Sequence, residues 1–222
     1  MDHTDWANKH KKRIAREFVR KTDFSISNNP VGIFTAGLPG AGKTEFTVEL
    51  LKGITNKPLR IDMDKIARLI EGYKPEIADK FRGGASAILA RIYDEVIKHK
   101  IDFVFDGTFS QARALQNLER ALNHGYQVKI YYIHQNPVIA WQFTKDRELT
   151  EHRAIDRAGF IDTYLKLHEN LINLCDSDKD VTISLIIKDK DNKVGRRIEA
   201  ISDLFTELPN FLTAEELESM IL

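Results

Sequence analysis

Apolar and polar positions along this chain follow two alternating periods. Short apolar runs rich in β-branched residues are typical of buried strands and predict five of them, at 31–35, 59–62, 101–105, 127–134 and 181–187. Between them, apolar residues recur three and four positions apart, which predicts helices at 44–53, 85–100, 111–124, 137–149 and 161–175. Alternating strands and helices form parallel sheets covered on both faces, so we predict a three-layer α/β fold with a five-stranded, mainly parallel sheet.

The segments outside this alternation are polar or broken by glycine and proline. Residues 81–84 and the stretch Arg147–Gly159 are predicted loops, and the second is expected to lie over the ligand site. A charged turn at 188–193 follows the fifth strand, and helices are predicted at Ile198–Leu208 and after a capping box at Thr213–Glu216. We therefore divide a single domain into a basic helix with its connection (1–30), a core (31–190) and C-terminal helices packed on it (191–222).

Composition limits the classes of partner. Lys and Arg total 33 residues, as do Asp and Glu, so no long-range field steers the chain toward nucleic acid or an anionic membrane. The single cysteine, Cys175, excludes an intramolecular disulfide and fits a reducing compartment. No stretch is long and apolar enough to span a membrane, and the N-terminus lacks a signal-peptide core. We expect a cytoplasmic protein with no nucleic-acid partner and no membrane span.

The N-terminal helix, predicted at 4–22, is basic. Its apolar residues can share one face, and lysines and arginines occupy the rest. Such a helix can lie on a membrane or nucleic acid, or it can pack on the core with a solvated basic face. The apolar stripe is thin and the net charge is zero, and both observations favour the second interpretation.

The first predicted strand runs directly into a segment that matches the P-loop pattern G-x-x-x-x-G-K-[ST]. Its glycines allow a sharp turn whose N–H groups point into one concavity, and the following helix adds the positive end of its dipole. The lysine reaches the β- and γ-phosphates, and the threonine hydroxyl ligates Mg²⁺. The sequence therefore predicts a P-loop kinase-like fold that binds ATP or GTP with Mg²⁺ through Gly37, Leu38, Pro39, Gly40, Ala41, Gly42, Lys43 and Thr44.

Two other predicted strands lead into acidic residues. Asp106 follows an apolar strand, where it can ligate Mg²⁺ or cap the next helix. Asp64 follows the second strand and can accept a proton from an acceptor hydroxyl; it can also be a helix cap, with Asp62 then the base. Because the carboxyl ends of parallel strands share one rim, we expect these carboxylates and Thr108 to face the P-loop and the substrates.

Other candidates carry weaker signals. Arg147 and Arg153 are the guanidinium groups placed to hold phosphate oxygens, although spacing alone favours surface ion pairs. The D-x-x-G match at 156–159 follows no strand and lacks an accompanying guanine-binding motif, so a signalling GTPase is disfavoured. The seven histidines show no metal-ligand spacing, and we interpret His134 as a packed or hydrogen-bonded residue.

This ordered set of motifs resembles the zeta toxin family of P-loop kinases, the toxin half of some bacterial toxin–antitoxin systems. The resemblance extends from about residue 31 to 181. It rests on GLPGAGKT (37–44), IDMD (61–64), FDGTFS (105–110) and WQFTKDRELTEHRAI (141–155). It implies a phosphotransferase that acts on the sugar 3′-hydroxyl of UDP-N-acetylglucosamine, and an inhibitory antitoxin as partner.

The resemblance also assigns roles by position. Lys43 and Thr44 correspond to the residues that bind phosphate and Mg²⁺, and Asp64 corresponds to the general base. Arg147 and Arg153 resemble the arginines that stabilise the transferring phosphoryl group, and Thr108 resembles a substrate-contact threonine.

The chain departs from the family pattern in its acceptor half. The segment 66–75, IARLIEGYKP, lacks the His-Pro that many family toxins carry near the sugar-nucleotide pocket, and Asp106 stands where glutamate is common. The spacing between the two arginines is also short. Three hypotheses follow: a UDP-sugar kinase, a kinase of another small molecule such as a nucleoside, metabolite or antibiotic, and a non-catalytic nucleotide-binding module.

Overall fold

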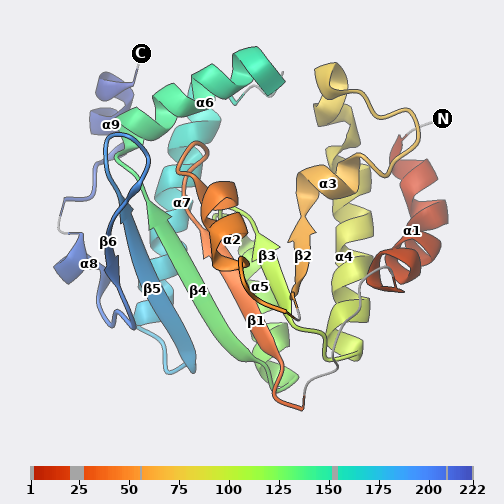
Figure 1. The fold of residues 1–222 in the computed structure, drawn as a ribbon. Coiled ribbons are helices and arrows are strands. Elements are labelled where there is room, and N and C mark those ends of the chain that lie inside the picture. The colour runs from red at the N-terminus through yellow and green to blue at the C-terminus, as the bar shows by residue number, and fades with distance from the viewer. Residues whose placement is uncertain (1–2, 21–27, 56, 152–154, 209, 222) are drawn as a thin grey trace.

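The computed structural model describes residues 3–20, 28–55, 57–151, 155–208 and 210–221, and shows a sheet flanked by helices (Figure 1). The strands are β1 (Val31–Ala36), β2 (Leu59–Asp62), β3 (Phe103–Asp106), β4 (Gln127–His134), β5 (Val181–Lys188) and β6 (Val194–Ile198). The helices are α1 (His3–Arg20), α2 (Lys43–Leu50), α3 (Met63–Ala67), the 3₁₀ helix η1 (Pro75–Phe81), α4 (Arg82–Lys98), α5 (Ala112–Asn123), α6 (Pro137–Glu151), α7 (Arg157–Cys175), α8 (Leu204–Glu207) and α9 (Ala214–Met220).

The strands lie in the order β2-β3-β1-β4-β5-β6; β5 and β6 pair antiparallel, and the other neighbouring strands pair parallel. The predicted α/β class with a mainly parallel sheet is therefore confirmed, while the predicted number of strands was one too few. The missing strand is β6, which lies between the predicted charged turn at 188–193 and the predicted helix that begins at Ile198. Four of its five residues are exposed, so the sequence has no apolar alternation there to indicate an edge strand.

Side chains of β4 show how the sheet is covered on both faces. Val128, Ile130 and Tyr132 belong to one core, which the buried residues of α1, α4 and α5 complete. Tyr131 and Ile133 point to the opposite face and join a second core built from α2, α6 and α9. Residues two apart on a strand share a face, so this alternation is what a strand covered on both sides produces.

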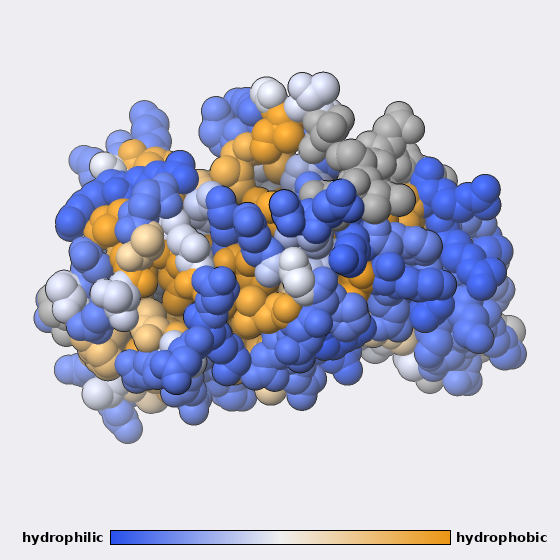
Figure 2. Space-filling view, turned by 90° about the horizontal axis from the view of Figure 1, so that it is seen from below, coloured by the Kyte–Doolittle hydropathy of each residue, from blue (hydrophilic) through white to orange (hydrophobic). Residues whose placement is uncertain are grey.

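Helix α1 packs against α4 at the edge of the molecule (Figure 1). Ala7, Ile14 and Ala15 are buried in the first core, and Ala7 approaches so closely that a Cβ on Gly84 would lie 3.0 Å from its own Cβ. The interpretation that this basic helix packs on the core is confirmed. Viewed from below, hydrophilic residues cover the α1 side, whereas apolar residues are exposed toward the other side (Figure 2).

Two predicted loops were wrong in their extent. The segment 81–84 contains the end of η1 and the start of α4. Helix α6 continues through Glu151, so Arg147 lies on a helix and not in a loop, and α7 begins at Arg157 after Asp156 caps it. Polar composition misled the prediction here because a solvent-facing helix end has the same composition as a loop. The predicted helix at 198–208 is reduced to the single turn α8.

Among the described residues, no helix combines the length and the apolar character that crossing a membrane requires.

Candidate active site

The P-loop connects β1 to α2 and is held by main-chain hydrogen bonds. Gly37 N–H donates to the Thr108 carbonyl at 3.2 Å, and Ala41 N–H donates to the Leu38 carbonyl at 3.1 Å. The Lys43 ammonium donates to that same Leu38 carbonyl at 2.7 Å. The loop therefore closes on itself and is tied to the segment that follows β3.

Two glycines of the loop occupy places that a side chain cannot enter. A Cβ on Gly37 would lie 2.5 Å from the Ile133 carbonyl oxygen of β4, and Gly37 has a φ of +148°. A Cβ on Gly40 would lie 2.1 Å from the Ala140 carbonyl oxygen of α6, and its φ is +77°. Both the conformation and the contact exclude other residues, so the glycines predicted from the motif are required by the fold.

Helix α2 begins without a side-chain cap. Its N-cap residue is Gly42, with a φ of 80°, which has no side chain to accept a hydrogen bond from the first turn. The N–H groups of a first helical turn need partners, and together with the helix dipole they favour an anion. Lys43 and Thr44 lie in this first turn, as predicted.

The register of the sheet brings two carboxylates together. Asp62 of β2 lies opposite Asp106 of β3, because both are the last residues of paired parallel strands. The Arg60 guanidinium lies between them: Nη2 is 3.2 Å from Asp62 Oδ2 and forms a short ion pair with Asp106 Oδ2, to which Nε also donates at 3.1 Å. Arg60 therefore offsets part of the repulsion between two carboxylates that the sheet register makes neighbours.

Asp106 is anchored on its other oxygen as well. The Thr35 hydroxyl donates to Asp106 Oδ1 at 3.3 Å, and the Gly107 N–H donates to that hydroxyl oxygen at 3.0 Å. Asp106 is not the cap of α5, whose N-cap is Gln111. The alternative that Asp106 is a helix cap was therefore wrong, and its carboxylate belongs to the rim.

Asp62 and Asp64 have different local roles. Asp62 is the N-cap of α3, since its Oδ1 accepts hydrogen bonds from the N–H groups of Asp64 at 3.0 Å and Lys65 at 3.4 Å. Asp64 lies in the first turn of that helix and lines the cavity described next. The cap is therefore Asp62, which leaves Asp64 as the carboxylate without a capping role and keeps it the better candidate for the general base.

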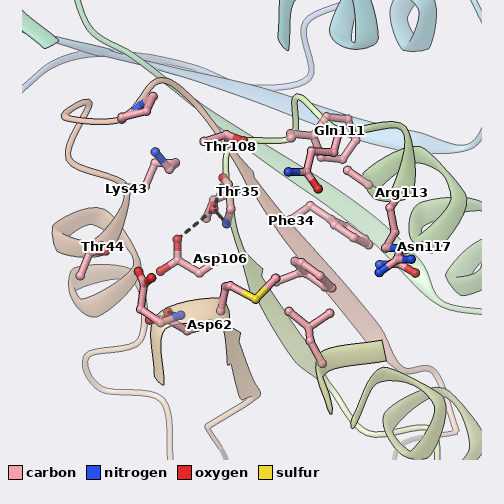
Figure 3. Close-up of a pocket in the computed structure, with 18 of the residues that line it drawn as sticks. Phe34, Thr35, Lys43, Thr44, Asp62, Asp106, Thr108, Gln111, Arg113 and Asn117 are labelled. Carbon is pink, nitrogen blue, oxygen red and sulfur yellow. Dashed lines mark hydrogen bonds between the residues drawn. The ribbon is translucent and has the colours of Figure 1, made fainter. Parts of the chain in front are cut away.

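A cavity of about 320 Å³ extends from the P-loop across the sheet rim. In Figure 3, Lys43, Thr44, Asp62 and Asp106 lie toward one end, and Gln111, Arg113 and Asn117 of the α5 region lie toward the other. Phe34 lies between the two ends. The cavity thus combines a phosphate end, an apolar wall and a second polar end.

The residues of the second polar end were not among the candidates identified from the sequence. Arg113 Nη1 donates to the Ser86 hydroxyl at 2.7 Å, which places a guanidinium at the mouth of the cavity. Asn117 is only 6% exposed, and its main-chain carbonyl accepts from the Tyr93 hydroxyl. A hydrogen-bonding group of an acceptor can be held here, away from the phosphate end.

Thr108 is brought to the cavity by a strained turn. The next residue, Phe109, has a φ of +63°, an uncommon conformation for a bulky side chain. It is maintained because Phe109 is 3% exposed and because the Asn170 amide donates to its carbonyl at 2.9 Å. The Thr108 hydroxyl lies 2.8 Å from Ser110 Oγ. The turn fixes Thr108 against both the P-loop and the cavity, which fits its predicted place near the substrate.

The two candidate arginines differ in what the structure shows of them. Arg147 of α6 lines the cavity, so the structure brings it to the P-loop as predicted. Arg153 lies outside the described residues.

Three residues near the phosphate end of the cavity were not identified from the sequence. Arg60 has an alternating strand position like any solvent-facing arginine, and only the register of β2 with β3 reveals its partners. Lys188 and Asn192 belong to the β5–β6 hairpin, and a Cβ on Gly42 would meet Asn192 at 3.0 Å and Lys188 Cε at 3.2 Å. Burial lowers the pKa of Lys188, with the neighbouring Glu45 opposing that shift. The unrecognised hairpin therefore contacts the P-loop.

The rim residues fit a magnesium ion that is held partly by a nucleotide. Mg²⁺ prefers oxygen ligands and commonly takes one or two from protein, completing its shell with phosphate and water. Thr44 Oγ1 and Asp106 Oδ2 both contact the cationic Arg60 guanidinium, at 3.4 Å for Thr44, so hard oxygens already converge on a positive charge. No group of three or more His, Cys, Asp or Glu residues suited to a metal is found in the described part of the chain.

Two further sequence interpretations are settled by hydrogen bonds. Asp156 Oδ1 accepts from the Gly159 N–H at 2.6 Å, so the D-x-x-G match is a helix cap. His134 Nδ1 is 3.1 Å from the Tyr132 hydroxyl, which is in turn 2.8 Å from His168 Nε2. Burial lowers the pKa of His134 to about 4, and the interpretation of His134 as a hydrogen-bonded structural residue is confirmed.

Solved structures share this architecture at low sequence identity. One described as the PezAT chromosomal toxin–antitoxin system of the human pathogen Streptococcus pneumoniae has a TM-score of 0.62 and 18% identity, over 99% of this chain and 88% of that chain. A second, the AvrRxo1-ORF1:-ORF2 complex with ATP, has a TM-score of 0.58 and 14% identity, over 93% and 68% of the two chains. At these identities the likeness establishes a P-loop kinase-like fold and no more.

Sequence comparison gives the family. None of the curated proteins searched matches the chain. The sequence model of the family described as Zeta toxin matches residues 14–195, which includes the P-loop, both carboxylate-bearing strand ends and Arg147. This chain belongs to the zeta toxin family.

Proposed function

We propose that this protein is a phosphotransferase that moves the γ-phosphate of ATP or GTP to a hydroxyl of a small molecule, most specifically UDP-N-acetylglucosamine or a related UDP-sugar. The observation that carries the proposal is the shared cavity. The cavity is lined by Lys43, Thr44, Asp64 and Arg147. The groups proposed to bind the triphosphate, to act as the base and to stabilise the transition state therefore face the same cavity. Phosphoryl transfer depends on such positioning more than on covalent chemistry.

Each group has a defined task in this proposal. The P-loop N–H groups and the Lys43 ammonium hold the β- and γ-phosphates, and Thr44 with Asp106 holds the Mg²⁺ that offsets phosphate charge when it is bound. Asp64 accepts the proton of the attacking hydroxyl. Arg147 stabilises the charge on the transferring group, and Thr108 orients the acceptor.

The choice of a UDP-sugar is supported by family membership and by the far end of the cavity. Arg113 and Asn117 offer a cationic donor and an amide there, which suit a diphosphate or a uracil edge. The solved relative described as a toxin–antitoxin system supports a cognate antitoxin as a protein partner.

A kinase of a different small molecule is the second candidate, and one observation favours it. None of the residues from 66 to 75 lines the cavity, although this segment carries the family's acceptor-side motif in other members. An acceptor smaller than a nucleotide sugar would use Ser86, Gln111 and Arg113 instead.

The test is a mass-spectrometric assay of purified protein with Mg²⁺ and either ATP or GTP. The acceptor panel contains UDP-N-acetylglucosamine, other UDP-sugars, nucleosides, sugar phosphates and aminoglycosides, with Asp64→Asn as the base-deficient variant. We expect a phosphorylated UDP-sugar that is lost in Asp64→Asn, while ATP binding by that variant is retained.

Other outcomes separate the alternatives. Phosphate on a different acceptor moves the protein to the second candidate with the same mechanism. ATP binding without product on any acceptor, and without a difference between the protein and Asp64→Asn, contradicts kinase activity and supports a nucleotide-binding module.

A further inference from the structure

Arg60 contacts three side chains of the rim that carry oxygens suited to a metal. Its guanidinium is paired with Asp106 Oδ2 and lies 3.2 Å from Asp62 Oδ2 and 3.4 Å from Thr44 Oγ1. Arg60 is 13% exposed at its side chain, Asp62 is 14% exposed and Asp106 is 7% exposed. A partly buried cation thus already holds the oxygens that would otherwise bind Mg²⁺.

The arrangement follows from sheet geometry. Asp62 and Asp106 lie opposite each other at paired strand ends, where two unscreened carboxylates repel. Arg60 is two residues before Asp62, so it shares a face of β2 with it and reaches both carboxylates. Arg60 does not line the cavity, which means that it acts on the site through Asp106 and Thr44 and not by touching an acceptor there.

Asp106 Oδ2 is the oxygen for which Arg60 and a divalent metal ion would compete. Oδ1 lies 3.3 Å from the Thr35 hydroxyl, whose single hydrogen is shared with the Gly107 carbonyl at 3.1 Å and whose oxygen accepts from the Gly107 N–H. Oδ2 accepts two donors of the same guanidinium, Nε and Nη2. A divalent ion that binds Oδ2 must therefore displace a bidentate, charge-assisted contact.

We propose that Arg60 is a resident cation of the rim, which holds the metal-binding oxygens together and competes with Mg²⁺ for Asp106 Oδ2. Because of this competition, Mg²⁺ binds well only together with a nucleotide. The phosphate oxygens supply further metal ligands, and these favour replacement of Arg60 by Mg²⁺ at Asp106 Oδ2. Arg60 is in this sense a positioning residue for the phosphotransferase proposed above, on which the inference rests.

The test is the Mg²⁺ dependence of nucleotide binding without an acceptor. Fluorescence of an N-methylanthraniloyl ATP analogue is titrated at fixed Mg²⁺ concentrations for the protein, for Arg60→Gln and for Arg82→Gln. Arg82 is the matched control, since it pairs with Asp79 at 2.9 Å on an exposed surface away from the rim. We expect Arg60→Gln to lower the half-saturating Mg²⁺ concentration about tenfold, a change of about 1.4 kcal/mol, and Arg82→Gln to leave it unchanged.

A second variant guards against loss of folding. Arg60→Gln leaves Asp62 and Asp106 as neighbours without a cation, so we expect a lower melting temperature without Mg²⁺ and recovery when Mg²⁺ is added. Arg60→Gln combined with Asp62→Asn removes that repulsion while the introduced amide oxygen still caps α3, and the same shift in Mg²⁺ dependence is expected. A structural role alone would lower the melting temperature and leave the Mg²⁺ requirement where it was.

The outcomes for the two proposals are distinct. A Mg²⁺ requirement that is unchanged or higher in both Arg60 variants overturns the competition and leaves the phosphotransferase intact. Failure of the acceptor panel, with a lowered Mg²⁺ requirement in the variants, overturns the phosphotransferase and supports the role of Arg60.

Discussion

The two sides of the phosphate site are built from different parts of the chain. On the P-loop side, the main chain shapes the site, and Gly37 and Gly40 allow the loop to approach β4 and α6. On the strand-end side, side chains make the site, and Arg60 pairs with both Asp62 and Asp106. One side is held by conformation and the other by electrostatics.

This difference determines how each side responds to change. A loop whose backbone contacts its neighbours cannot accept a methyl group, but it contains few charges that ions or pH can alter. A cluster of charges keeps its shape when a side chain is shortened, yet its occupancy depends on the cations available. We therefore expect substitutions in the loop to abolish ligand binding, and substitutions in the charged cluster to change its affinity for cations.

The largest effect is expected from Gly40→Ala. The new Cβ would overlap the Ala140 carbonyl oxygen at 2.1 Å and adopt a φ of +77°, so the loop or α6 must move. We expect ATP binding, measured by calorimetry, to fall at least about 100-fold, because displacement and backbone strain of a few kcal/mol act together.

Gly53→Ala is the matched control for that substitution. Gly53 has nearly the same φ, +78°, but a Cβ there meets nothing within 4 Å. We expect a loss of stability of about 1 kcal/mol from the conformation alone, and unchanged ATP binding. If the two variants bind ATP equally well, the close contact does not define the loop.

Arg147→Ala tests a cation that α6 contributes to the cavity. We expect the rate of phosphoryl transfer to fall about 100-fold, since arginines of this kind act on transition-state charge, while ATP affinity changes little. Lys145→Ala is the control on the same helix, because Lys145 Nζ pairs with Glu148 at 2.9 Å and does not line the cavity. Equal losses in both variants would indicate a general effect of α6 and not a role in transfer.

The conformational side of this comparison was predictable from sequence. The P-loop pattern specifies glycines, lysine and threonine at fixed spacing, and the structure forms the loop between the strand and helix that the motif needs. The strand ends with Asp62 and Asp106 were also predictable, since apolar runs locate strands and parallel strands share a rim. Their opposition across β2 and β3 required the register, which a single sequence does not encode locally.

The charged cluster at the strand ends and the edge strand β6 were less predictable from the sequence. Arg60 looks like any polar strand residue until its two partners, 2 and 46 positions away, are brought together. The hairpin residues Lys188 and Asn192 reach Gly42 only because β6 pairs with β5, and an exposed edge strand lacks the alternating pattern that identifies buried ones. Long-range contacts of polar residues determine this half of the site.

Acid is expected to weaken the fold through a buried histidine that lies outside the phosphate site. His168 is 5% exposed; its Nδ1 must donate to the Tyr164 carbonyl at 2.8 Å, and its Nε2 accepts from the Tyr132 hydroxyl. Burial lowers the pKa of His168 from 6.5 to about 4, so the unfolded chain takes up a proton at higher pH than the folded one. The stability contributed by neutral His168 is complete above about pH 6.5 and is lost as the pH falls toward 4.

We therefore expect the free energy of unfolding to fall by about 1.4 kcal/mol per pH unit through His168 between about pH 6 and pH 4.5. Urea unfolding across this range measures the slope, and His168→Gln should reduce it by about that amount while lowering stability at pH 7. An unchanged slope in His168→Gln would assign the acid sensitivity to other groups.

The smallest effect separates the two neighbouring aspartates of the IDMD segment. Asp62→Ala removes the side-chain cap of α3, whereas Asp62→Asn retains a capping oxygen. Thermal unfolding with saturating Mg²⁺ should show Asp62→Ala to be less stable than Asp62→Asn by about 1 kcal/mol. If Asp64 is the base, Asp62→Asn also keeps phosphoryl transfer within a few-fold, because it leaves the proton acceptor in place. If Asp62→Asn loses phosphoryl transfer and Asp64→Asn retains it, the general base is Asp62 and not Asp64.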